Sequence, residues 1–135
     1  NLNQMKLTIE IPDTYMLNMM CNASYRDYTA LDGELEKAYK WAKENPEALA
    51  DLDMPECWEP QVFAYLRANT EHQVLILDEF GNSVYPLTWG KMCKAMQLMA
   101  KDYTHHFDDL IQENDDATTA DVFLQLSLFG DVIYG

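Results

Sequence analysis

Basic residues are scarce in this chain of 135 residues. Nine Lys and Arg stand against 23 Asp and Glu, which gives a formal net charge of −14 at pH 7. No Lys or Arg follows Lys101, although acids continue to Asp131. Binding to a phosphate backbone depends on clustered basic side chains, so direct nucleic-acid binding is excluded. The charge favours a partner with a basic protein surface, while a purely solubilising role for the acids is the alternative.

Cysteine is also scarce. Cys21, Cys57 and Cys93 are far apart and form no CxxC pair, which excludes a disulfide framework or a zinc knuckle and favours reduced thiols in a cytoplasm. No apolar run approaches the ~18 residues of a membrane helix, and the first residues lack the apolar core of a signal peptide. We therefore expect a cytoplasmic protein with no membrane partner.

Signatures of enzymes are missing as well. The five glycines form no phosphate-binding loop, and there is neither a GxSxG motif nor a catalytic-cysteine signature. The expectation is a protein without catalytic residues or cofactors.

What is present is the composition of a folded domain. Hydrophobic residues make up 48% of the chain and charged residues 24%, close to globular averages. We predict a single α+β domain over residues 5–135, with a small antiparallel sheet of about three to four strands packed against several helices. Residues 1–4 are expected to be a remnant of an expression vector, because Met5 has the features of a natural start.

Hydrophobic periodicity predicts the elements. Alternation over 6–11 predicts a first strand with Leu7, Ile9 and Ile11 facing the core. An antiparallel meander is expected from the strands 62–66, 73–77 and 83–85, ended by Pro86. Helices are expected over 15–21, 34–43, 47–52, 88–103, 105–111 and 122–129.

Several details accompany these helices. Leu35, Ala38, Tyr39 and Ala42 are predicted to share a buried face, opposite a Glu36–Lys40 pair. Thr118 and Asp121 approximate a capping box for the last helix. Met96, Met99, Val122, Leu126 and Phe129 are predicted to be buried together. Gly130 suits the C-terminus of that helix, and residues 132–134 return as a strand or a tail.

Candidate functional residues fall into two groups. Tyr25 and Tyr28, in an acidic helical insertion around residues 25–59, would be interface anchors if exposed. The acids near the C-terminus would form a face that binds a basic surface: Asp108, Asp109, Glu113, Asp115 and Asp116.

A metal site is the weaker interpretation of the same region. His105, His106, Asp108 and Asp109 are suitable ligand types, but adjacent histidines point about 100° apart on a helix and do not readily face one ion. The acidic stretch 113–116 lacks the glycine and the DxDxDG pattern of a calcium loop. We therefore predict no metal site.

The C-terminal half carries a resemblance. The segment MAKDYTHHFDDLIQENDDATTADVFLQ (99–125) and the ending LFGDVIYG (128–135) resemble a family of small, mostly uncharacterised proteins encoded by tailed phages and prophages. The match covers roughly residues 88–135, and the segment 7–21 is similar in pattern only. Members often carry a glycine-rich aromatic segment after the first helix, where this chain has Asn22–Tyr28.

The resemblance implies an accessory protein of a mobile element and supplies no catalytic residues. Combined with the acidity, it predicts an inhibitor of a bacterial defence system, CRISPR or restriction, that binds a host protein or ribonucleoprotein stoichiometrically and imitates nucleic-acid charge. The alternatives are a small-ligand or nucleotide-signal binder, a structural or assembly protein of the phage, and a metal-dependent enzyme using His105 and Asp109. Homo-oligomerisation stays open.

Overall fold

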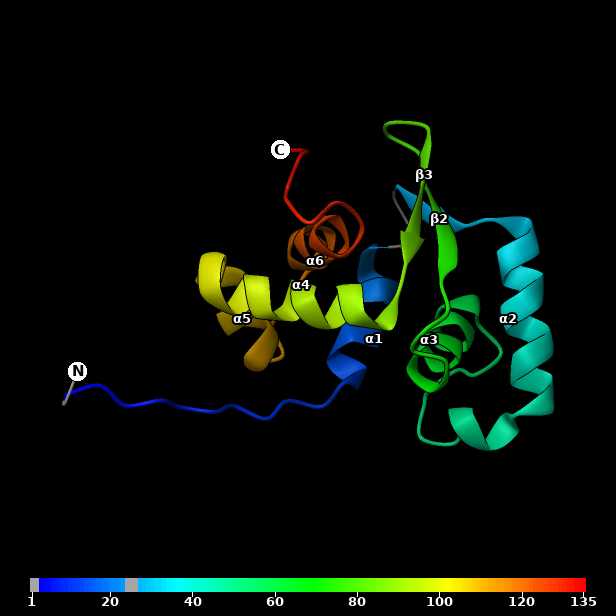
Figure 1. Ribbon diagram of the computed structural model, residues 1–135, viewed down its shortest axis with the longest axis horizontal. Helices are drawn as coiled ribbons and strands as arrows, with labels where there is room; N and C mark the ends of the chain where they lie inside the picture. The colour runs from blue at the N-terminus through cyan, green and yellow to red at the C-terminus, as the bar shows by residue number, and fades with distance from the viewer. Residues whose placement is uncertain (1–2, 24–26) are drawn as a thin grey trace.

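Three antiparallel strands form the sheet of the computed structural model, which describes residues 3–23 and 27–135 (Figure 1). The strands lie in the order β1 (Tyr28–Ala30), β2 (Val74–Asp78) and β3 (Ser83–Leu87). Ile76 in the central strand is opposite Ala30 on one side and Tyr85 on the other. This sheet, together with the six α-helices of the described residues, confirms the predicted α+β class.

Two groups of helices cover the sheet. Figure 1 shows α2 and α3 on one side of the strands, and α4, α5 and α6 on the other. The helices around the α6 side are α1 (Thr14–Ala23), α4 (Trp89–Asp102), α5 (Thr104–Ile111) and α6 (Ala117–Phe129). The second group comprises α2 (Asp32–Glu44), the 3₁₀ helix η1 (Pro46–Leu49) and α3 (Trp58–Ala68). None of the helices in the described part of the chain combines the length and apolar character needed to span a bilayer.

A large part of the core lies where α1, α4 and α6 meet. Met19, Met92, Met99 and Phe123 are each fully buried there, as the methionine spacing along α4 predicts. Thr88 begins α4 by accepting a hydrogen bond from the Lys91 amide. Gly130 ends α6 with φ of 76°, the left-handed conformation that glycine adopts without a steric penalty.

The predicted strand over residues 62–66 is wrong. The segment belongs to α3, all of whose residues from Pro60 to Leu66 are buried. A short apolar run looks alike in a buried strand and in a buried helix, so periodicity did not separate them. The strand that completes the sheet is β1, a segment of three residues that the sequence analysis did not predict.

The predicted first strand over residues 6–11 is also wrong within this chain. The segment is extended but pairs with no strand of the described chain, and Leu7 is 82% exposed. Only Ile11, nearest to α1, packs partly against the core. The tail 132–134 likewise forms no strand.

Pro86 does not end β3 as predicted, because it is paired with Leu75 inside the strand. Leu31 N donates to Leu75 O, so the polar backbone groups of Leu75 face β1. The opposing Pro86 nitrogen therefore points away from β2, and an edge strand tolerates its missing N–H there.

Two smaller expectations also differ. The cap of α6 is Asp116, whose side chain accepts a hydrogen bond from the Thr119 amide at 2.9 Å, rather than Thr118. Tyr39 is 48% exposed, because the buried face of α2 is carried by Ala38 and Ala42.

Several details are confirmed. Glu36 pairs with Lys40 at 3.1 Å on α2. Met96, Met99, Val122 and Leu126 are buried in the same core, whereas Phe129 is only partly buried and packs against Tyr85.

Candidate protein-binding groove

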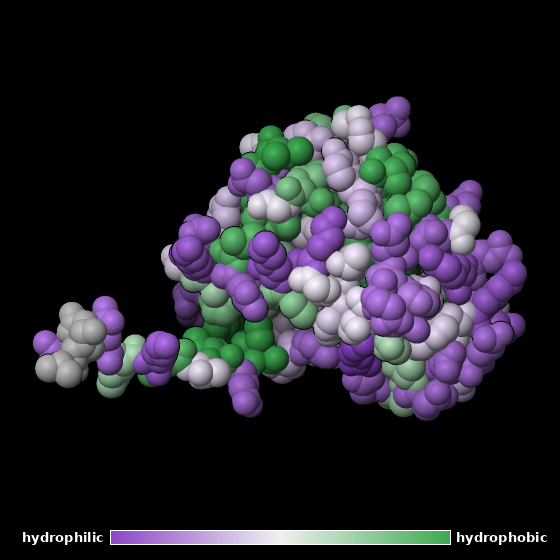
Figure 2. Space-filling view, in the orientation of Figure 1, coloured by the Kyte–Doolittle hydropathy of each residue, from purple (hydrophilic) through white to green (hydrophobic). Residues whose placement is uncertain are grey.

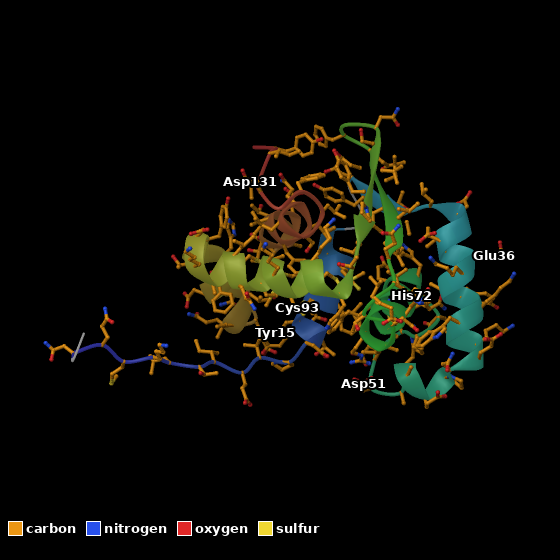
Figure 3. All side chains as sticks on the ribbon, in the orientation of Figure 1. Tyr15, Glu36, Asp51, His72, Cys93 and Asp131 are labelled. Carbon is orange, nitrogen blue, oxygen red and sulfur yellow. The ribbon has the colours of Figure 1, made fainter. Side chains whose placement is uncertain are left out.

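A groove runs along the exposed face of α1. It comprises two neighbouring hollows of about 270 and 480 Å³ that share five lining residues: Tyr15, Asn18, Cys21, Asn22 and Glu113. One wall is the α5–α6 connection, and the other is the segment from Asp51 to Pro60. We call it the α1 groove; Tyr15 and Asp51, which line it, are labelled in Figure 3.

Every charged side chain that lines the α1 groove in the described chain is acidic: Asp51, Asp53, Glu59, Glu113 and Asp115. Arg67 neutralises Asp51, because Nη2 of Arg67 lies 2.9 Å from Oδ1 of Asp51. The hydrogen bonds from Arg67 lower the pKa of the Asp51 carboxyl. The acids come from two distant parts of the sequence, residues 51–59 and 113–115, and together they give the groove a negative lining.

Side chains of α1 hold two of these acids. The Tyr15 hydroxyl donates to Glu113 Oε1 at 3.4 Å, and Asn22 Nδ2 donates to Asp115 Oδ2 at 3.2 Å. Burial first, and then the nearby Glu113, raise the pKa of Tyr15. The hydroxyl therefore stays protonated and keeps donating over the whole neutral range.

The backbone of the groove is unusual at two positions. Met54 and Glu113 have φ of 52° and 58°, in the left-handed region that non-glycine residues rarely occupy. Such conformations cost free energy and persist where the surrounding structure enforces them, often at binding sites. The Met54 side chain is 62% exposed and lines the groove together with Asp53, Glu59 and Glu113. The groove thus combines negative charge with an exposed apolar group.

Cys21 lies in the same groove but is poorly suited to nucleophilic chemistry. Burial, followed by the neighbouring Glu59 and Cys57, raises the pKa of its thiol to about 11. The thiolate is the reactive form of cysteine, so at neutral pH this side chain is protonated.

The structure divides the acids predicted to form one face. Glu113 and Asp115 line the α1 groove, whereas Asp108, Asp109 and Asp116 do not. Asp108 accepts a hydrogen bond from Gln112 Nε2 at 3.0 Å. Asp116 caps α6, and the Thr119 amide that it binds lowers the pKa of its carboxyl. Asp116 therefore has a structural task at a helix end.

The structure does not support Tyr28 as an exposed anchor. Tyr28 is 3% exposed, and its hydroxyl donates to Asp121 Oδ1 at 3.1 Å. Burial and that carboxylate raise the pKa of Tyr28. Its ring is therefore part of the core and does not present a surface to a partner. Tyr25 lies outside the described residues.

His105 and His106 face different neighbours. His105 Nε2 lies 3.6 Å from Asp109 Oδ2, whereas His106 Nδ1 makes a 3.1 Å hydrogen bond with Thr119 Oγ1 on α6. Within residues 3–23 and 27–135, no three His, Cys, Asp or Glu side chains are grouped so that they could hold a metal ion.

The sequence did not predict four residues of the groove: Tyr15, Asp53, Met54 and Glu59. Tyr15 is 98 residues from Glu113 in sequence, and no local pattern indicates that α1 packs beside the α5–α6 connection. The available signal was only the acidity around residues 51–59. Comparison of the chain with protein-family models, curated proteins and solved structures found no match.

Proposed function

We propose that this protein is a stoichiometric binding protein whose α1 groove holds a basic, partly apolar segment of another protein. The observation that carries the proposal is the acidic lining of the groove, which includes Asp53, Glu113 and Asp115, together with the exposed Met54 in the same groove. A row of Lys or Arg side chains would meet the acids, and an apolar residue between them would cover Met54.

The resemblance of the C-terminal half to phage and prophage accessory proteins supports a particular class of partner. Nucleases of bacterial defence, in CRISPR or restriction systems, have Lys- and Arg-rich channels that bind the nucleic-acid backbone. We therefore propose anti-defence inhibition: the acidic groove occupies such a basic surface in place of nucleic acid, inside the bacterial host cell.

The test is a titration of purified candidate nuclease complexes with wild-type protein and with the triple variant Asp53→Asn, Glu113→Gln, Asp115→Asn. The variant removes three charges with little change in shape, and we expect its dissociation constant to rise by about 10- to 100-fold at low salt. Raising the salt concentration should weaken binding of the wild-type protein and reduce the difference between the two proteins.

A matched control is the variant Glu44→Gln, Glu47→Gln, Asp102→Asn, which removes the same charge from exposed positions outside the groove. If both triple variants lose affinity equally, net charge alone drives binding and the groove is not the site. Pull-down from a bacterial lysate at low and at high salt, with mass spectrometry, identifies candidates for the titration.

A second candidate is binding of a small anionic ligand between α4 and α6. A hollow of about 520 Å³ there is lined by Lys91 and Lys94 together with apolar residues of α6, including Leu126 and Phe129. Burial lowers the pKa of Lys91, whose Nζ donates to Pro86 O at 2.6 Å and lies 3.4 Å from Leu128 O. A thermal-shift screen with nucleotides tests it, and a Lys94→Gln variant should lose any shift that this site produces.

A further inference from the structure

An extended arm, residues 3–11, runs away from the body of the protein (Figure 1). Met5 and Leu7 are each 82% exposed and Ile9 is 63% exposed. They alternate with Lys6, Thr8 and Glu10, so an extended backbone places the apolar side chains on one face and the polar ones on the other. Figure 2 shows hydrophobic residues gathered where the arm joins the body.

The arm has the pattern of a half-buried strand, but the sheet of its own chain does not accept it. The free edge of β3 contains Pro86, which has no N–H to donate, and Lys91 Nζ already occupies the Pro86 carbonyl at 2.6 Å. The other outer strand, β1, has only three residues. The strand pattern of the arm is therefore unsatisfied within the described chain.

An apolar hollow of about 180 Å³ lies at the root of the arm. Its walls are Ile11, Pro12 and Asp13 of the chain entering α1, Met16 of α1, and Trp89, Cys93 and Met96 of α4. All of these except Asp13 present apolar or weakly polar surface. The hollow adjoins the arm at Ile11, so one chain carries both an exposed apolar stripe and an open apolar hollow side by side.

We propose that two copies of this chain exchange their arms in a symmetric dimer. The exposed apolar stripe of the arm lies next to the apolar hollow on the same surface. A closed two-fold contact between two copies therefore buries both stripes and both hollows at once. Antiparallel pairing of the arms with Ile9 opposite Ile9 places Leu7 of one copy opposite Ile11 of the other, next to the hollow. Residues directly opposite share a face, so the apolar side chains of both arms cover the two hollows together.

Charge agrees with this register. Pairing centred on Ile9 places Lys6 of one arm diagonally across from Glu10 of the other, within reach of long side chains. The bodies, in contrast, repel each other because each chain carries a formal charge of −14. Dimerisation should therefore strengthen with added salt, opposite to the salt response expected for a basic partner in the α1 groove.

Sedimentation velocity of the full chain over a concentration series tests the proposal. We expect a dimer in the wild-type protein and a dissociation constant at least about 100-fold higher in Leu7→Asp, Ile9→Asp, because two apolar contacts per arm are replaced by charges. Both residues are exposed outside the core, so circular dichroism should show an unchanged fold. The control is Tyr39→Asp, a comparable change at an exposed aromatic residue of α2 that belongs neither to the arm nor to the α1 groove.

Cross-linking tests the register. Ile9→Cys should form a dimer linked through residue 9 under mild oxidation, identified by peptide mass, whereas Thr8→Cys should not, because residue 8 is opposite residue 10. A wild-type protein that stays monomeric at all concentrations up to about 1 mM overturns the proposal, as does a dimer that persists in Leu7→Asp, Ile9→Asp. These results are independent of the groove variants, so either proposal can fail alone.

Discussion

The hydroxyl of Tyr134 donates a hydrogen bond to Oδ2 of Asp78 at 2.6 Å, which joins the C-terminal tail to the end of β2. Asp78 is fully buried, and its other carboxylate oxygen accepts a hydrogen bond from the Phe80 amide at 3.0 Å. The Tyr134 ring also stacks on Phe80, with centroids 5.2 Å apart. The tail is therefore fixed to the β2–β3 turn although it forms no strand.

Gln125 holds the same tail from α6. It is fully buried, and its Oε1 accepts hydrogen bonds from the amides of Ile133 and Tyr134 at 2.8 and 2.9 Å, while its Nε2 donates to Asp121 at 2.7 Å. Replacement by the similarly sized methionine leaves these groups without their partner. We expect Gln125→Met to lower the free energy of unfolding by about 2 kcal/mol, measured by urea denaturation.

The control is Gln112→Met, at the exposed position directly after α5, whose side-chain amide donates to Asp108. Its effect should stay within about 0.5 kcal/mol. Equal losses in the two variants would show that the network around Gln125 contributes little to stability.

The sequence predicted those helices for which the hydrophobic periodicity and the residues that begin or end a helix point to the same segment. Thr88 and the methionine spacing define α4, and the all-round apolar run ending at Gly130 defines α6. The strand at 62–66 failed because a fully buried helix has no polar face from which to recognise its period. The strand predicted over residues 6–11 is wrong for a different reason. Alternation shows that the sequence is compatible with a strand, but only the fold shows whether a sheet edge is available to pair with it.

The candidate site was predictable in part. Acidity pointed to Glu113 and Asp115, but not to the division of the C-terminal acids into groove residues and the helix cap Asp116. Tyr28 illustrates the limit of aromatic residues as interface signals. Its acidic sequence context suggested exposure, whereas its ring is buried and its hydroxyl bonds to Asp121 on α6, a residue 93 positions away.

Core packing gives a second prediction. Phe123 of α6 is fully buried, and Phe123→Ala should reduce the free energy of unfolding by about 3–5 kcal/mol through lost burial and the cavity left behind. Phe80→Ala is the comparison, because that ring is 68% exposed and its removal should cost about 1 kcal/mol or less. Chemical denaturation of both variants measures the difference, and similar losses would contradict the packing described for α6.

Stability should fall at alkaline pH. The hydrogen bond to Asp78 is the main cause that raises the pKa of Tyr134 to about 12, from an ordinary value of 10.0. Between these values the folded chain keeps a proton that the unfolded chain releases. The stabilisation that the protonated Tyr134 provides is therefore fully present below pH 10 and is lost as the pH rises towards 12. Melting temperatures measured across this interval test the expectation. The decrease should be shallower in Tyr134→Phe, and an identical decrease would assign the effect to other tyrosines.

Gly81 provides the last prediction, because it leaves room for the contact between Tyr134 and Asp78. A Cβ at this position would lie 2.7 Å from the Tyr134 hydroxyl, closer than real contacts allow, and 3.0 Å from Asp78 Oδ2, which is a tight contact. In Gly81→Ala we expect the tyrosine ring to move away, since the end of a side chain shifts more easily than the turn. Its hydrogen bond is then lost, and the pKa of Tyr134 should fall from about 12 towards its ordinary value. Ultraviolet titration of tyrosinate, compared with Tyr134→Phe to assign the signal, measures this change.

Gly90→Ala is the matched control, because nothing lies within 4 Å of a Cβ there and alanine favours the helix by about 0.5–1 kcal/mol. An unchanged Tyr134 titration in Gly81→Ala would mean that the hydrogen bond to Asp78 does not control this pKa.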